Sequence, residues 1–151
     1  MTTKILVVCD PHRTSAKIQA LGARLLGRKP HPAMPYHCAW MTDEAIYDMN
    51  WTFRELPRDY YEGKNRDLRI FDSPVQITDE YFRSLVGKVK YGTFDVLLYP
   101  IFQLVGLNWW GTHCSERIND DLWFHGYRTP WIPYGAPPSP ADILAWLEGR
   151  S

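Results

Sequence analysis

The chain has 151 residues, of which 45% are hydrophobic and 23% are charged. This length and composition exclude a disordered protein and favour one domain with an ordinary core, spanning residues 1–151. Seventeen basic residues balance seventeen acidic ones, so the net charge calls for neither nucleic acid nor an anionic membrane as partner. A polarised surface is still compatible with this zero sum.

The three cysteines, Cys9, Cys38 and Cys114, are odd in number and widely spaced, which does not fit a disulfide framework. Reduced thiols favour folding in a cytoplasm. The first apolar run, residues 5–9, is too short for the core of a signal peptide. No stretch approaches the roughly 20 apolar residues of a membrane span. We therefore expect a cytoplasmic location and no membrane span.

Local patterns predict strands and helices in a mixed order. In chain order they are a strand at 4–10, an amphipathic helix at 15–28, a hairpin of strands 36–42 and 45–51, a strand at 68–72, and helices at 78–91, 94–107 (kinked at Pro100), 114–126 and 140–149. Ile18, Leu21, Leu25 and Leu26 share one face of the first helix. This order predicts an α+β fold, with a small antiparallel sheet packed against helices.

Cys114 is the candidate nucleophile. The reactive form of cysteine is the thiolate, whose pKa of about 8.5 must be lowered for it to form at neutral pH. Cys114 stands where an irregular segment, residues 111–113, meets a predicted helix. A helix N-terminus lowers a thiol pKa, as does a nearby imidazolium, and its unpaired N–H groups can bind a substrate oxyanion. The alternative is a buried, inert cysteine.

His37 is the candidate base because of its place on the predicted hairpin. A turn at residues 43–44 gives a register in which Ala39 faces Asp48 and His37 faces Asn50. Side chains alternate along strands, so His37, Asp48 and Asn50 share one face. An amide or carboxylate that holds the base is what a Cys–His pair needs. We expect Asn50, directly opposite, to fill this role rather than the diagonal Asp48.

Three segments resemble a known family. Residues 35–51 (PYHCAWMTDEAIYDMNW), 91–123 (YGTFDVLLYPIFQLVGLNWWGTHCSERINDDLW) and 137–148 (PPSPADILAWLE) are similar, in order, to blocks of the circularly permuted papain-like (NlpC-like) cysteine hydrolases, phage-type members included. His precedes Cys, as in the permuted branch. The resemblance implies a permuted papain-like fold, with Cys114 as nucleophile, His37 as base and Asn50 or Asp48 as the third residue. Tyr36 before the His and His113 before the Cys depart from the family pattern.

Other residues have secondary roles in this interpretation. Tyr91, Trp109, Trp110 and His113 are candidate substrate-binding residues; packing is the alternative role for Tyr91, and His113 is a weaker candidate for the base. The spacing of Cys and His residues lacks the two close pairs of a structural zinc site, so we expect no metal. No glycine-rich phosphate loop is present, and we expect no cofactor.

The resemblance implies hydrolysis of an amide or peptide bond through a thioester, with a cell-wall peptide as the favoured substrate. It also suggests a phage virion or host protein as a further partner, and a virion-associated location besides the cytoplasmic one. Two alternatives stay open. One is a thioesterase or acyltransferase acting on lipid-like chains, and the other is a non-catalytic phage structural or binding module.

Overall fold

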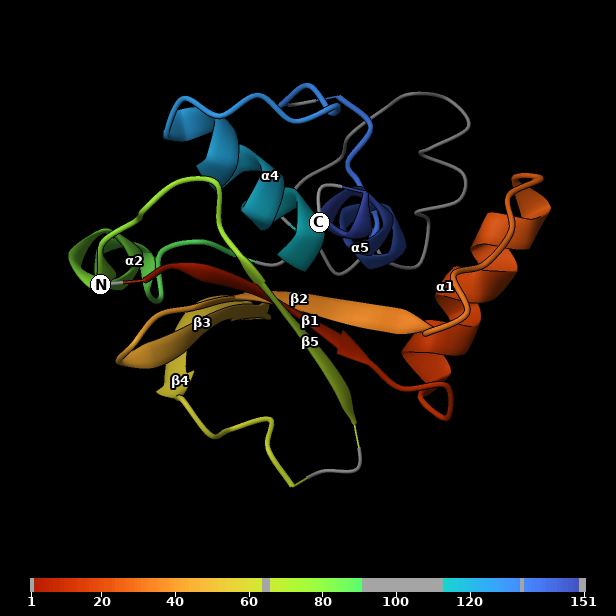
Figure 1. Ribbon diagram of the computed structural model, residues 1–151, viewed down its shortest axis with the longest axis horizontal. Helices are drawn as coiled ribbons and strands as arrows, with labels where there is room; N and C mark the ends of the chain where they lie inside the picture. Colours follow the sequence, from red (N-terminus) through yellow and green to blue (C-terminus); the bar gives the residue numbers. More distant parts are fainter. Residues whose placement is uncertain (1, 64–65, 91–112, 134, 150–151) are drawn as a thin grey trace.

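The computed structural model describes residues 2–63, 66–90, 113–133 and 135–149. Its strands are β1 (Lys4–Cys9), β2 (Pro35–Met41), β3 (Ala45–Asn50), β4 (Thr52–Pro57) and β5 (Asp67–Asp72). Its helices are α1 (Thr14–Leu25), α2 (Asp79–Leu85), α4 (Cys114–Phe124) and α5 (Pro140–Glu148). The five strands form one antiparallel sheet, which confirms the predicted α+β class (Figure 1).

The sheet has the strand order β4-β3-β2-β1-β5, so β2 lies at its centre. The β2–β3 hairpin has the predicted register, with Ala39 opposite Asp48. Its turn is closed by Thr42, whose hydroxyl accepts hydrogen bonds from the N–H groups of Glu44 and Ala45, each at 3.2 Å. A β-hydroxyl at this position commonly stabilises a tight turn, which explains why the register could be predicted from local sequence.

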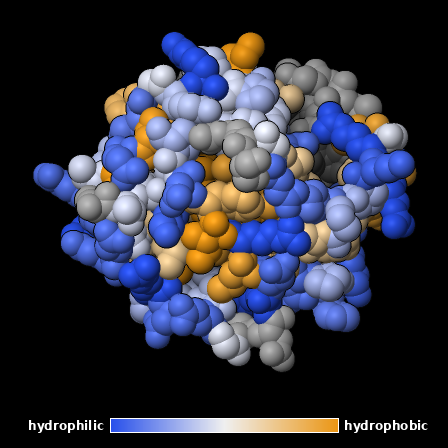
Figure 2. Space-filling model, in the orientation of Figure 1, coloured by the Kyte–Doolittle hydropathy of each residue, from blue (hydrophilic) through white to orange (hydrophobic). Residues whose placement is uncertain are grey.

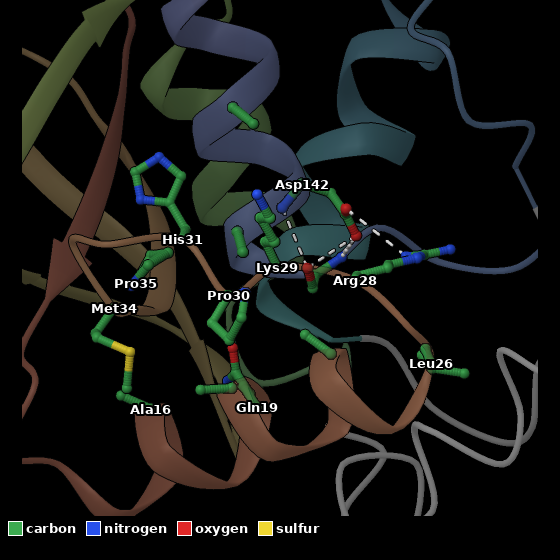
Figure 3. Close-up of a pocket in the computed structure, with 15 residues that line it drawn as sticks. Ala16, Gln19, Leu26, Arg28, Lys29, Pro30, His31, Met34, Pro35 and Asp142 are labelled. Carbon is green, nitrogen blue, oxygen red and sulfur yellow. Dashed lines mark hydrogen bonds and ion pairs between the residues drawn. The ribbon is translucent and has the colours of Figure 1, made fainter.

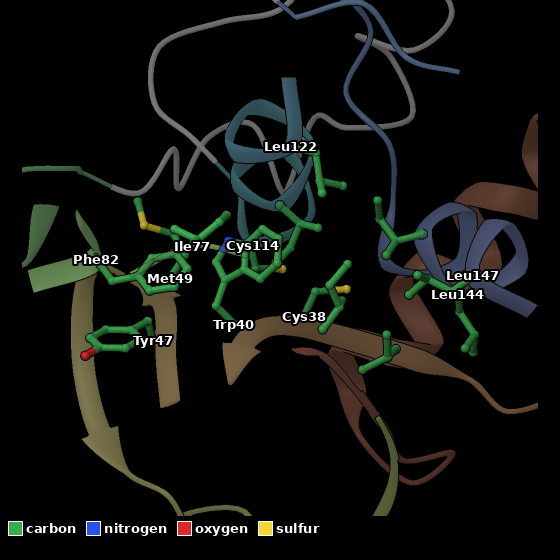
Figure 4. Packing of buried hydrophobic residues seen from close by; sticks show 14 of the residues in the cluster. Cys38, Trp40, Tyr47, Met49, Ile77, Phe82, Cys114, Leu122, Leu144 and Leu147 are labelled. Carbon is green, nitrogen blue, oxygen red and sulfur yellow. The ribbon is translucent and has the colours of Figure 1, made fainter. Parts of the chain in front are cut away.

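Helices α4 and α5 cover one face of the sheet, and the main core lies between them and the strands (Figures 1 and 4). The core side chains from the strands alternate with those of the other face, as the strand period of two requires. The largest side chains of this core, from strands and helices together, are fully buried: Trp40, Tyr47, Phe53, Phe82, Ile5, Met49, Ile77, Ile118, Leu122 and Ile143. Alternate residues of β2 therefore reach the first turn of α4.

The opposite face of the sheet carries a smaller apolar cluster. It contains Leu6, Val8, Ala39, Ile46 and Tyr61, with the last of these coming from the loop after β4. Apolar residues reach the surface in the middle of Figure 2, where Figure 1 places the strands. Asp48, opposite Ala39, also lies on the face that carries this cluster.

Helix α1 is oriented opposite to what its apolar stripe suggests. Its large aliphatic residues are exposed, by 46% at Ile18, 57% at Leu21 and 74% at Leu25, whereas Ala16 and Gly22 are buried. Small residues let the helix backbone approach β2 closely, so α1 packs through its small face. The periodicity predicted the helix correctly, but its apolar stripe does not mark the face that packs against the sheet.

The remaining predicted helices have mixed outcomes. α2 ends at Leu85, earlier than predicted, because Gly87 has a positive φ of 73° and Lys90 forms a bridge with Thr52 of β4. The predicted helix at 94–107, with its kink at Pro100, lies outside the described residues. In the described ranges, no helix is both long and apolar enough to cross a membrane.

Candidate active site

Cys114 is the first residue of α4, as the sequence predicted. The preceding residue, His113, is extended (φ −86°, ψ 164°) and its N–H donates to the carboxylate of Glu116 at 3.2 Å. A glutamate in this position satisfies a free backbone donor and adds negative charge where the helix dipole favours it. The hydroxyl of Ser115 donates to the carbonyl of Pro138 at 2.6 Å, which ties the start of α4 to the segment before α5.

The thiol of Cys114 is buried and faces β2. The ring of His37 and the backbone N–H groups of Cys38 and Ser115 lie near it and lower its pKa, against the effect of burial. The residue is 5% exposed and lies in the core cluster beside Cys38 and Trp40 (Figure 4). The nucleophile and the base proposed from the sequence are therefore close enough to shift each other's pKa, although 77 positions separate them along the chain.

His37 lies where β2 and β3 separate. The ladder between these strands ends at the pair Ala39–Asp48, and His37 is paired on its other side with Val8 of β1. His37 Nε2 lies 3.2 Å from Asp48 Oδ2, and its side chain is 13% exposed. Because Nε2 faces Asp48, Nδ1 is the ring nitrogen available to the Cys114 thiol.

Asp48 is the most densely hydrogen-bonded residue of the site. Besides His37, it accepts from Arg54 Nε at 2.7 Å, from Arg54 Nη2 at 3.1 Å and from the hydroxyl of Tyr61 at 2.5 Å. Its side chain is fully buried. Burial alone would raise the pKa of this carboxyl, but the hydrogen bonds from His37, Arg54 and Tyr61 lower it well below its ordinary value. Asp48 is therefore a carboxylate at neutral pH.

The expected contact between Asn50 and His37 is not formed. Asn50 is exposed at the end of β3 and pairs with Thr52 of β4. The chain reverses direction at Trp51, which has a left-handed φ of 63°. Asn50 is therefore paired with β4 and does not lie opposite β2. The partner of His37 is Asp48, and the prediction that Asn50 would orient the ring was wrong at this point.

The electrostatics of the Cys114–His37 pair favour the charged form of both groups. Burial would raise the pKa of the Cys114 thiol, yet the adjacent His37 and the N–H groups of Cys38 and Ser115 lower it. Burial likewise opposes a charge on His37, but Cys114 and Asp48 raise its pKa well above the ordinary value. These directions describe a thiolate–imidazolium pair, which is the nucleophilic state of a Cys–His site.

The other two thiols have the opposite tendency. Burial raises the pKa of Cys9 to about 11, and it raises the pKa of Cys38 as well. Neither has an imidazole partner among the described residues. Of the three cysteines, Cys114 alone is placed for nucleophilic chemistry.

His113 does not share the chemistry of His37. Burial lowers the pKa of its ring to about 4, so the ring is neutral near pH 7. The structure places it at the N-cap of α4, with 6% of the residue exposed. Tyr91, Trp109 and Trp110, proposed from the sequence to border the substrate, lie outside the described residues.

Two residues of the site were missed from the sequence. Arg54 and Tyr61 fall in the segment 52–66, which looked polar and irregular. Arg54 lies directly opposite Asp48 in the β3–β4 ladder, so extending the hairpin by one more strand would have found it. Tyr61 comes from the loop after β4, and no local pattern connects that loop with Asp48.

A cavity of about 160 Å³ lies between α1, α5 and the segment before β2 (Figure 3). Its walls include Ala16, Met34, Pro35 and Ala145, and Arg28 stands at its edge, 3.9 Å from Asp142. Neither Cys114 nor His37 lines it. Within the described ranges, no three His, Cys, Asp or Glu side chains are grouped so as to hold a metal ion.

Comparison of the chain with protein-family models, with curated proteins and with solved structures finds no match. The interpretation of this site therefore depends on its own geometry and on the resemblance of its sequence blocks.

Proposed function

We propose that the protein is a cysteine hydrolase that cleaves an amide or peptide bond, with a permuted papain-like fold. The observation that supports this most is the contact chain Cys114–His37–Asp48 at the start of α4, within the described residues. A nucleophile bonded to a base, and a base held by a third group, is the arrangement that covalent acyl transfer requires. The order of His before Cys fits the permuted branch that the sequence resembles.

In the proposed reaction the Cys114 thiolate attacks the substrate carbonyl carbon, and the carbonyl oxygen takes up the negative charge. The N-terminus of α4, where the helix dipole favours negative charge, is the proposed site for that oxygen. The His37 imidazolium gives its proton to the leaving amine as the C–N bond breaks, which leaves a thioester. Neutral His37 then takes a proton from water, whose oxygen attacks the thioester and releases the acid and the thiolate.

Asp48 has an orienting role in this proposal. Its carboxylate accepts from His37 Nε2, which leaves Nδ1 directed at the thiol, and it stabilises the positive charge on the ring. Arg54 and Tyr61 hold the carboxylate in turn, so that it neither rotates nor becomes protonated at neutral pH. The three residues therefore act on the reaction through His37.

The substrate class comes from the resemblance rather than from the geometry. It favours a cell-wall peptide, and hence a phage- or host-associated context. Acyl thioesters are the alternative substrate of the same Cys–His pair, and a non-catalytic binding module is the alternative without chemistry. A Cys114 thiol whose pKa is lowered by His37, with His37 hydrogen-bonded to Asp48, supports an enzyme over a binding module.

The test incubates the protein with peptidoglycan fragments and, separately, with acyl thioesters and phospholipids, each with and without a chelator. Cleavage of peptide stems that survives chelation and is lost in Cys114→Ala is the expected result. Cys9→Ala is the matched control, because Cys9 is equally buried but lies on β1 outside the contact chain. Turnover of acyl esters alone would favour the thioesterase, and no turnover with an unreactive Cys114 would favour the binding module.

A further inference from the structure

The outer face of α1 joins an exposed aliphatic stripe to a basic flank. Ile18, Leu21 and Leu25 are spaced by three and four residues, so they form one continuous stripe along the helix. Each is between 46% and 74% exposed. The opposite face of α1 packs on β2 through small residues, and a cavity lies between α1 and α5 (Figures 1 and 3). The stripe therefore points away from the body of the protein.

The charged residues within α1, Lys17 and Arg24, are both basic. Lys17 precedes Leu21 by four residues and Arg24 follows it by three, so both lie next to Leu21 on the helix surface. Neither makes an ion pair among the described residues, and both are exposed. Arg13 and Lys29 extend the basic region at the two ends of the helix.

No acidic residue interrupts this region. Between Asp10 and Asp43 the sequence contains no Asp or Glu, although the whole chain has as many acidic as basic residues. From the other elements, Asp142 of α5 approaches Arg28, at 3.9 Å, and no acidic side chain forms an ion pair with Lys17 or Arg24 in the described residues. Although the net charge of the chain is zero, the outer face of α1 is basic and carries exposed aliphatic side chains.

We propose that this face of α1 binds the surface of an anionic lipid bilayer. A helix that exposes large aliphatic residues beside lysine and arginine lies in the bilayer interface, with its aliphatic residues among the acyl chains and its cations at the phosphates. The long stems of Lys17 and Arg24 can follow Leu21 into the interface while their charges stay in the headgroup region. The outward position of α1 lets it lie flat on such a surface without any rearrangement of the sheet.

This inference is independent of the proposed hydrolase activity. It depends on α1 alone, and Cys114 and His37 belong to other elements of the chain. An acidic protein groove is the competing partner for a basic amphipathic helix. The bilayer is favoured because the aliphatic stripe is flanked by cations that neither pair with acids nor pack on the body of the protein, as interfacial binding requires.

The experiment is cosedimentation of the full chain with vesicles of phosphatidylcholine alone or with added phosphatidylserine. We expect binding to the anionic vesicles and little to the neutral ones, with a loss at high salt because the headgroup attraction is screened. The variant Lys17→Gln/Arg24→Gln should weaken binding by about 25-fold, at about fivefold per charge. Leu21→Asn/Leu25→Asn should abolish it, while circular dichroism shows an unchanged fold.

Two control variants keep the test specific. Ile132→Asn removes an aliphatic side chain that is 72% exposed outside α1, and Lys88→Gln/Lys90→Gln removes two exposed cations beyond α2. Both should bind like the unmodified protein. Absence of binding to anionic vesicles at low salt, or equal weakening by the controls, would overturn the proposal. A dimer in solution that Leu21→Asn/Leu25→Asn converts to a monomer, without vesicle binding, would instead assign the stripe to a second copy of the chain.

Discussion

His37 and Asp48 lie diagonally across the point at which β2 and β3 separate, with Nε2 of the ring 3.2 Å from Oδ2 of the carboxylate. The separation of the strands matters because it lets Cys114, on the helix-covered face, contact a ring whose partner lies on the other face. The pair therefore connects the two sides of the sheet, and removing the carboxylate of Asp48 should change the reactivity of the Cys114 thiol.

The first prediction compares Asp48→Asn with Asn50→Ala. Loss of the carboxylate should lower turnover by about 100-fold or more, because both the orientation and the charge stabilisation of His37 are lost. Asn50→Ala should leave turnover nearly unchanged, since Asn50 is exposed and pairs with Thr52. The rate of Cys114 alkylation at pH 6 gives a second readout that needs no substrate. A larger effect for Asn50→Ala, with both variants folded, would contradict the assignment.

The sequence predicted what depends on short-range patterns. The β2–β3 register followed from a two-residue turn and alternating side chains, and the start of α4 at Cys114 followed from the change from irregular to periodic sequence. The preference for Asn50 failed because the register was extended past the end of the ladder. The left-handed backbone at Trp51, which turns the chain into β4, has no local signature because tryptophan rarely adopts it.

Longer-range features could not be predicted in the same way. The loop that carries Tyr61 to Asp48 is fixed by packing in the apolar cluster that also contains Val8 and Ala39 of neighbouring strands, and not by its own pattern. The orientation of α1 is set by close packing of its small residues, which outweighs exposure of three aliphatic side chains. Both outcomes are tertiary effects, and periodicity describes only what each segment prefers on its own.

The second prediction concerns thiol reactivity. Cys114 should be the cysteine that is alkylated first by iodoacetamide near pH 6, because its pKa is lowered by His37 whereas that of Cys9 is raised to about 11. The rate at Cys114 should rise with pH through an inflection below the ordinary thiol value. In His37→Gln that inflection should move upward, since burial then acts on the thiol alone. Preferential labelling of Cys9 or Cys38 in mass spectrometry would refute this prediction.

The third prediction concerns Arg54, whose guanidinium makes two hydrogen bonds to Asp48. Arg54→Met leaves a buried carboxylate short of its main cation, so the free energy of unfolding at pH 7 should fall by about 1–3 kcal/mol. The folded-state pKa of Asp48 should also rise. The contribution of the Asp48 carboxylate to folding stability is present above its unfolded pKa of about 3.9 and is lost as the pH falls through its folded pKa. In Arg54→Met this loss should occur at a higher pH.

Urea unfolding at several pH values measures both effects. Arg83→Met is the matched control, because Arg83 also contacts two carboxylate oxygens, of Glu44 and Glu55, but at the surface. Exposed ion pairs contribute little, so this control should unfold like the unmodified protein. Equal losses in Arg54→Met and Arg83→Met would mean that Asp48 does not depend on its buried environment.

The last prediction concerns His113 and the acid stability of the fold. Burial lowers the pKa of this ring from 6.5 to about 4, so between these values the unfolded chain binds a proton that the folded chain does not. Stability must therefore fall as the pH is lowered through this window, by up to about 3 kcal/mol. His113→Asn keeps a residue that caps helices well and removes the titrating ring. Urea unfolding of the two proteins between pH 7 and pH 4 should then give curves that diverge towards low pH, with the unmodified protein losing more stability, because all other titrating groups are shared. Parallel curves would show that the ring of His113 can be protonated without leaving its site.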